Sequence, residues 1–160
     1  MHRYLLGLSL FLFAWPSLAQ AEAALAARPG WTVIATEKSY ADLLEDLRTA
    51  VKAQKFGLVT EAGPTSVAKA RGIEIPGNRV VGVFRNDYAV RILRLSTAAM
   101  IEAPIRFYVT ENPDGTATLS FKHPTAVFAP YMDAADADLR VAAEELDTAF
   151  DAIAAAATAP

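Results

Sequence analysis

Cysteine is absent from the 160 residues of the sequence, and histidine occurs only as His2 and His123. Without cysteine the chain has no disulfide, thiol redox chemistry, iron–sulfur cluster or thiolate metal site. We expect His2 to be removed with a signal peptide, which leaves too few histidines for a zinc or copper site built from several of them. The sequence therefore predicts no metal and no cofactor.

Positive charge is also scarce. The chain has 15 Lys and Arg residues against 18 Asp and Glu residues, for a formal net charge of −3. A partner that depends on phosphate neutralisation, such as nucleic acid, is therefore not expected. No G-x-S-x-G motif or calcium-binding D-x-D-x-D-G loop is present, so no catalytic residue and no metal ligand is predicted.

The first residues have the pattern of a secretory signal peptide, predicted over residues 1–21. A positively charged start precedes the apolar run Leu5–Trp15, and small residues follow, which places the cleavage site after Ala19 or Ala21. The run is shorter than the roughly 20 residues of a membrane span, and no later segment approaches that length. We expect an exported protein, located in the periplasm, with no membrane span once the signal is removed.

The remainder indicates a short linker over residues 22–30 and a single domain over residues 31–158. Strand and helix patterns alternate and end in a hairpin followed by one long amphipathic helix, in the order β-α-β-α-β-α-β-β-α. This order predicts an α+β fold of two layers, with a mostly antiparallel sheet and a C-terminal hairpin. We expect an N-proximal helix, Ser39 to Lys55, and a C-terminal helix with its apolar stripe from Leu139 to Ala157 to cover the sheet.

The hairpin is the most informative part of the sequence. Apolar and polar residues alternate on both sides of an Asn-Pro-Asp-Gly turn, which is the pattern of two half-buried strands. A three-residue loop with a left-handed Gly115 makes one face uniformly apolar and the other polar. In this register Arg106 lies opposite Lys122, and Tyr108 lies opposite Ser120. Like charges in such positions repel each other.

Several groups could offset this repulsion. The nearby carboxylates Glu102 and Glu111, a carboxylate from a helix, a partner chain or a bound anion would each serve. An ordinary solvated face with its own carboxylates is the simplest interpretation, because surface charges usually have no further role.

A candidate anion site lies where a strand ending at Arg85 meets a helix that begins near Asn86. Free backbone N–H groups at a helix start attract anions. If that strand lies beside the hairpin, Arg85 would converge with Arg106 and Lys122 on one anionic group. We therefore predict the following ligand-binding residues: Arg85, Asn86, Asp87, Arg106, Tyr108, Lys122 and His123.

His123 directly follows the hairpin, and its side chain has several alternative roles. It could act as a general base, together with Tyr108 or a carboxylate, or as an axial haem ligand. Its imidazole could equally close a hydrogen bond at the end of the strand. Nothing in the sequence marks a carboxylate that would orient it.

Two stretches, Val83–Leu93 and Ala103–Pro124, together with the closing helix, resemble the domain of unknown function 302 family. The likeness covers about residues 32–155. It implies a compact α+β fold, often dimeric, in an exported, proteobacterial-type member, with no established activity or cofactor. Arg85 and Asp87 stand where the family has Gly and Pro, and a histidine that many members carry is missing here.

Our leading hypothesis is a non-enzymatic periplasmic binding or accessory protein that holds a small anionic ligand, or a carboxylate of a protein partner. One alternative is a small hydrolase or isomerase that uses His123. Another is a structural homodimer in which the face carrying Arg106 is the interface.

Overall fold

The computed structural model describes residues 25–132 and 137–160. The predicted signal peptide over residues 1–21 lies outside the described residues, so it stays a prediction. Within the described ranges, no helix combines the length and the apolar character that a membrane span requires.

The chain forms one antiparallel sheet of five strands in the order β1-β5-β4-β3-β2. Its strands are β1 (Trp31–Ser39), β2 (Gly57–Ala62), β3 (Asn78–Phe84), β4 (Ile105–Glu111) and β5 (Thr116–Lys122). Its helices are α1 (Tyr40–Ala53), α2 (Thr65–Ala70), α3 (Asn86–Leu95), α4 (Pro124–Phe128) and α5 (Ala137–Thr158), with short 3-10 turns η1 (Ala98–Glu102) and η2 (Ala129–Tyr131).

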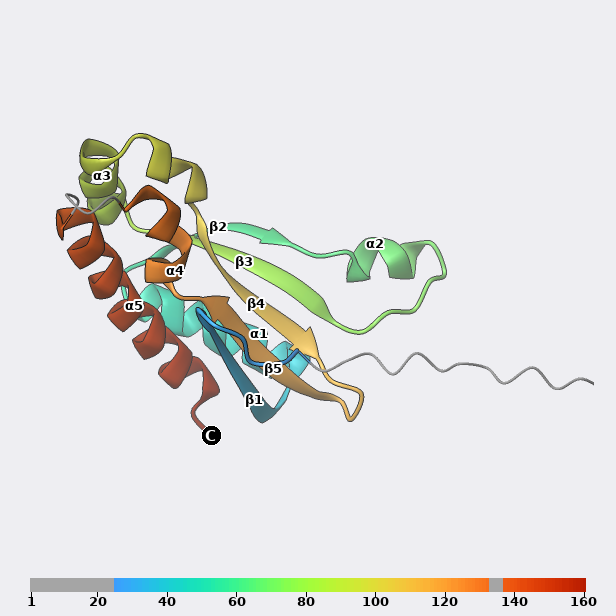
Figure 1. Cartoon of the computed structure of the whole chain (residues 1–160). Coiled ribbons are helices and arrows are strands. Elements are labelled where there is room, and N and C mark those ends of the chain that lie inside the picture. The colour runs from blue at the N-terminus through green and yellow to red at the C-terminus, as the bar shows by residue number, and fades with distance from the viewer. Residues whose placement is uncertain (1–24, 133–136) are drawn as a thin grey trace, which may run out of the picture.

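Helices α1 and α5 pack against each other and cover one face of the sheet (Figure 1). Three of the fully buried rings lie together in the core, Phe107 of β4, Phe121 of β5 and Phe150 of α5. The Phe107 and Phe150 rings are stacked with centroids 4.5 Å apart, and Phe121 meets Phe107 edge-on at 5.2 Å. The predicted α+β class, with its antiparallel sheet and two covering helices, is confirmed.

The hairpin of β4 and β5 has the predicted register. Phe107 pairs with Phe121, and Tyr108 pairs with Ser120, while Gly115 has the left-handed φ of 83° that the three-residue loop requires. The apolar side chains of both strands therefore face the helices, and the polar ones face the opposite side of the sheet, which we call the open face.

An arm projects from this body where β2 and β3 extend to α2 (Figure 1). Several apolar side chains of this arm are exposed, namely Val59, Val67, Ile73 and Ile75. The arm lies beyond the two helices that cover the core, so these side chains have no layer to pack against.

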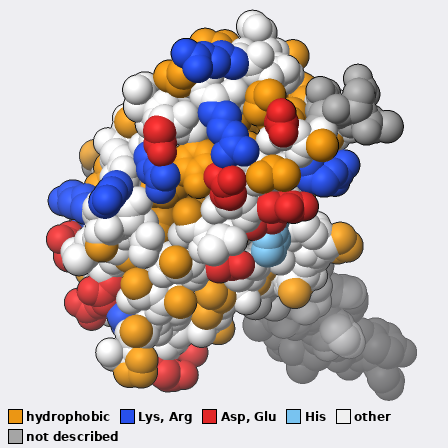
Figure 2. All heavy atoms as spheres, turned by 90° about the vertical axis from the view of Figure 1, so that its left-hand side faces the viewer, with side chains coloured by type: hydrophobic (Ala, Val, Ile, Leu, Met, Phe, Trp, Pro, Cys, Tyr) orange, Lys and Arg blue, Asp and Glu red, His pale blue; other side chains and the backbone are white. Residues whose placement is uncertain are grey.

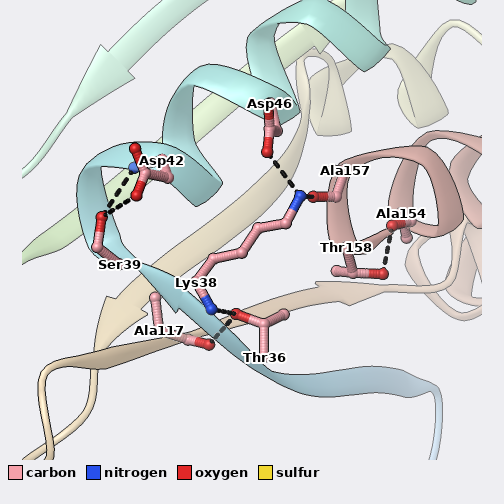
Figure 3. Close-up of polar contacts among 9 residues, drawn as sticks. All are labelled: Thr36, Lys38, Ser39, Asp42, Asp46, Ala117, Ala154, Ala157 and Thr158. Atoms are coloured by element: carbon pink, nitrogen blue, oxygen red, sulfur yellow. Dashed lines mark hydrogen bonds and ion pairs between the residues drawn. The ribbon is translucent and has the colours of Figure 1, made fainter. Parts of the chain in front are cut away.

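Lys38 joins the two layers at the end of β1 (Figure 3). Its ammonium group donates to Asp46 Oδ2 of α1 at 2.6 Å and to the backbone oxygen of Ala157 near the end of α5 at 3.0 Å. The side chain is only 18% exposed. A cation at the C-terminus of a helix is favoured by the helix dipole and by the unpaired carbonyl groups there.

We expect Lys38→Met to lower the free energy of unfolding by about 1–2 kcal/mol, because it removes a charged donor from two acceptors. Urea denaturation measures the change. Lys52→Met, at an exposed position of α1, is the matched control and should change the stability by less than about 0.5 kcal/mol. Equal effects of the two substitutions would contradict the role of Lys38.

Candidate functional site

A groove on the open face is lined by two cationic side chains, by aromatic rings and by one side-chain amide. Because side chains alternate along a strand, Trp31 of β1, Tyr108 and Arg106 of β4 and Lys122 of β5 all project to this face. The groove has a volume of about 390 Å³. Its lining comprises Trp31, Asn78, Val80, Ile105, Arg106, Phe107, Tyr108, Phe121, Lys122 and Val127.

Arg106 and Lys122 are both exposed, and the hairpin register places them beside each other. Lys122 Nζ lies 5.5 Å from the centroid of the Trp31 ring, a cation–π contact that leaves its positive charge without a counterion. Among residues 25–132 and 137–160, neither cation forms an ion pair. The predicted repulsion is therefore not offset by a carboxylate of this part of the chain.

The two carboxylates nearest in sequence are engaged elsewhere. Glu102 accepts a hydrogen bond from the Tyr131 hydroxyl at 2.8 Å, and Glu111 accepts one from the backbone N–H of Gly77 at 2.6 Å. The hydrogen bond to Glu102 raises the pKa of Tyr131. Three of the alternatives therefore remain for the pair, namely solvation by water, a partner chain and a bound anion.

Tyr108 supplies a directed polar group in the same groove. Its hydroxyl oxygen accepts a hydrogen bond from the Asn78 side-chain amide, so its own proton remains available for a ligand. Tyr108 and Asn78 also line a second hollow of about 310 Å³. That hollow is further lined by Leu25, Pro64, Ile75, Pro76, Gly77, Thr110, Glu111, Asn112 and Pro113.

Arg85 does not join this groove, and the predicted convergence is wrong. Val81 and Val83 of β3 are buried in the core, and Arg85 follows them with the same alternation, so it lies on the side of the helices. Its guanidinium group stands over the Tyr88 ring at 4.4 Å and the Phe56 ring at 5.3 Å. The thickness of the sheet separates it from Arg106.

The residues that begin α3 form a closed arrangement. Arg85 Nε and Nη2 donate to the two carboxylate oxygens of Asp87 at 2.9 and 2.8 Å. This hydrogen bonding lowers the pKa of Asp87 and raises that of Arg85. With Asp87 at the start of the helix, the positive end of the dipole already has its anion. Asn86 is exposed beside this pair and is likewise remote from the groove.

His123 also lies on the side of the helices, not in the groove where we expected it. Nε2 is 3.0 Å from Thr32 Oγ1, and Nδ1 is 4.0 Å from Asp147 Oδ2. The imidazole packs against Phe121 with ring centroids 5.6 Å apart. The strand-end hydrogen bond considered from the sequence is therefore present, and a carboxylate of α5 faces the other ring nitrogen without a hydrogen bond to it.

Of the seven predicted residues, the groove unites Arg106, Tyr108 and Lys122. Sequence reasoning missed Trp31, Asn78 and Val80 at this site. Their strands are recognisable from the sequence, but nothing in their composition indicates that β1 and β3 flank the hairpin. In the described part of the chain no three His, Asp or Glu residues are grouped so as to hold a metal ion.

A family model described as "Domain of unknown function DUF302" matches residues 31–157. The fold is similar to the crystal structure of an uncharacterized conserved protein DUF302 from Bacillus stearothermophilus, with a TM-score of 0.69 and 16% sequence identity over 79% of this chain and 96% of that chain. This likeness shows the fold alone. No curated protein matches the sequence.

Proposed function

This chain belongs to the DUF302 family of domains of unknown function, and we propose a function for it on the basis of the groove on the open face. It is a binding protein for a small organic anion whose charged group lies between Arg106 and Lys122. The body of the anion packs against the apolar and aromatic walls.

The observation that carries this proposal is the cation pair. Two positive side chains side by side destabilise a sheet, and no described carboxylate pairs with either of them. A carboxylate or phosphate would satisfy both charges, since a guanidinium group presents two parallel donors that match such a group. A hydrogen bond to a charged group contributes about 1.5–3 kcal/mol of net free energy.

The walls of the groove favour an anion with an apolar part. Trp31 and Tyr108 supply aromatic surface and Val80 supplies aliphatic surface. A volume of about 390 Å³ lies within the range of small-molecule sites, which are mostly apolar with a few well-placed polar groups. The Tyr108 proton adds one directional donor. An aromatic or short aliphatic carboxylate fits this combination.

We further propose that the protein acts after export, in the periplasm. The support is the pattern of residues 1–21, with its charged start, apolar run and small residues. The intact mass of protein recovered from a periplasmic extract should correspond to cleavage after Ala19 or Ala21. Full-length protein confined to the cytosol would contradict this proposal.

Thermal unfolding with added anions tests the binding proposal. A panel of benzoate, phenylacetate, hexanoate and inorganic phosphate should include at least one stabiliser, whose effect follows RT ln(1 + [L]/Kd). We expect Arg106→Gln to weaken binding about 10- to 100-fold, because it removes a charged donor. Arg94→Gln, at an exposed position of α3, is the matched control and should leave binding unchanged.

Two results would contradict the proposal. One is a ligand shift that is equal in wild type and Arg106→Gln. The other is a dimer that sediments as such at low salt and dissociates at high salt or in Arg106→Gln, because screening weakens exposed charges at an interface. The second result would show that the cation pair forms part of an interface with another chain.

A further inference from the structure

Three polar side chains from separate elements meet at the edge of the sheet, away from the groove. Thr32 lies on the edge strand β1, His123 directly follows β5, and Asp147 lies on α5. Thr32 Oγ1 is 3.0 Å from His123 Nε2, and His123 Nδ1 is 4.0 Å from Asp147 Oδ2. A hydroxyl thus faces one ring nitrogen and a carboxylate faces the other, which is the order of groups in a nucleophile, base and orienting acid.

The carboxylate is held in place by a second set of contacts. The backbone N–H and the hydroxyl of Thr125 donate to the two oxygens of Asp147 at 2.9 and 2.6 Å. Its negative charge favours the tautomer of His123 with the proton on Nδ1. Nε2 is then the acceptor, and the Thr32 hydroxyl donates to it.

The distance of 4.0 Å between His123 Nδ1 and Asp147 Oδ2 is too long for a hydrogen bond. Once the imidazole takes up a proton, however, the two groups carry opposite charges. The carboxylate therefore faces the ring that becomes positively charged after proton transfer, and such contacts often tighten only during reaction.

The imidazole is accessible from solvent. The side chains of His123 and Asp147 are 31% and 21% exposed, and the histidine is visible at the surface beside acidic groups (Figure 2). Thr32 is partly exposed on a strand that has no neighbour on its outer side. Each of the three side chains therefore has some contact with solvent.

We propose that Thr32, His123 and Asp147 form a hydrolytic site for small activated carboxylic esters. Thr32 Oγ1 attacks the carbonyl carbon, while its proton passes to His123 Nε2. The bond between the carbonyl carbon and the alcohol oxygen then breaks, and the leaving group departs as the alcohol or as its more stable anion, with the proton of His123 going to it or to water. Water, activated by the same nitrogen, releases the acid and restores the Thr32 hydroxyl.

The test uses the full chain and p-nitrophenyl acetate. Wild type should release p-nitrophenol faster than buffer, and peptide mass spectrometry of the quenched reaction should find the acetyl group on Thr32. Thr32→Val keeps the shape of the side chain and removes the hydroxyl. This variant should form no acetyl adduct and should react at least about 100-fold more slowly, because a positioned base usually contributes that much to the rate. Thr32→Ser should retain both.

Thr36→Val is the matched control. Thr36 lies on the same strand and donates to the backbone oxygen of Ala117 at 2.7 Å, so its loss should leave the rate unchanged. Asp147→Asn should slow the reaction by at least about 10-fold, since the protonated imidazole then lacks its carboxylate.

Three outcomes would overturn the proposal. They are a wild-type rate equal to buffer, a folded Thr32→Val protein with the wild-type rate, and acetylation of lysine or of the imidazole without any adduct on Thr32. The last of these needs no variant, so it decides the matter even if a substitution prevents folding. This site is independent of the anion groove, because it lies on the other face of the sheet.

Discussion

Phe107→Ala is expected to lower the free energy of unfolding by about 3–5 kcal/mol, which is the usual result of truncating a fully buried aromatic residue. Phe107 has no exposed surface. Its ring is stacked on Phe150 with an interplanar angle of 14° and also meets Phe121. Removing it leaves a cavity between the sheet and α5 that these neighbours fill only partly.

The loss should be a large part of the total stability, because domains of this kind are stable by only about 5–15 kcal/mol. Chemical denaturation followed by circular dichroism measures it. Phe107→Leu should cost less, about 1–2 kcal/mol, since most of the volume remains. Thr110→Ala, which lies on the open face of the same strand, should change stability by less than about 0.5 kcal/mol. Equal losses for Phe107→Ala and Thr110→Ala would contradict the assignment of the two faces.

Gly63→Ala is expected to lower the free energy of unfolding by roughly 1–3 kcal/mol, the usual range for forcing an extra carbon into a packed position. A Cβ at Gly63 would lie 2.0 Å from the backbone oxygen of Asn78 and 3.1 Å from its carbonyl carbon. Rotating a side chain cannot relieve a collision with backbone atoms. The arm and the start of β3 must therefore move apart.

This substitution should also weaken anion binding, because Asn78 is the residue that holds the Tyr108 hydroxyl. Denaturation and ligand titration measure the two effects. Gly57→Ala is the matched control at the other end of β2, since its Cβ would meet the backbone oxygen of Phe84 at 3.6 Å and Val59 Cγ1 at 4.0 Å, which are ordinary contact distances. If both alanine variants match wild type in stability, the close approach of Gly63 to β3 is wrong.

The local elements were predictable because their causes lie within short stretches of sequence. The hairpin register depends on the alternation of side chains and on one left-handed glycine, and both are visible in the sequence. The C-terminal helix was recognised from its helical spacing. Its buried residues include every predicted member of the apolar stripe, from Leu139 to Ala157. The resemblance to the DUF302 family is confirmed by the match over residues 31–157.

The placement of Arg85 was not predictable in the same way. The strand before it reads Val-Val-Gly-Val-Phe and is apolar on both faces, so its composition does not show which face meets the helices. The structure buries Val81 and Val83 on the helix side of the sheet and leaves Val80 in the groove. Because of this orientation of β3, Arg85 lies on the opposite side of the sheet from Arg106 and Lys122.

The contacts of His123 depend on even longer-range pairing. Thr32 and His123 are 91 residues apart, and they meet only because β1 pairs with β5 at the edge of the sheet. Asp147 lies on α5 outside the apolar stripe that packs on the core. Its approach to His123 depends on the packing of α5 against α4 and β1.

Sequence alone determined the α+β class, the hairpin with its adjacent cations, and the amphipathic helix that covers the core, because turn chemistry and side-chain periodicity act over a few residues. Strand order and the face that each strand presents to the helices were decided only by the tertiary structure. The physical reason is that packing energy depends on which apolar surfaces meet, and surfaces distant in the chain compete for the same partner. Both candidate sites arise at that level, one on the open face and one at the β1 edge.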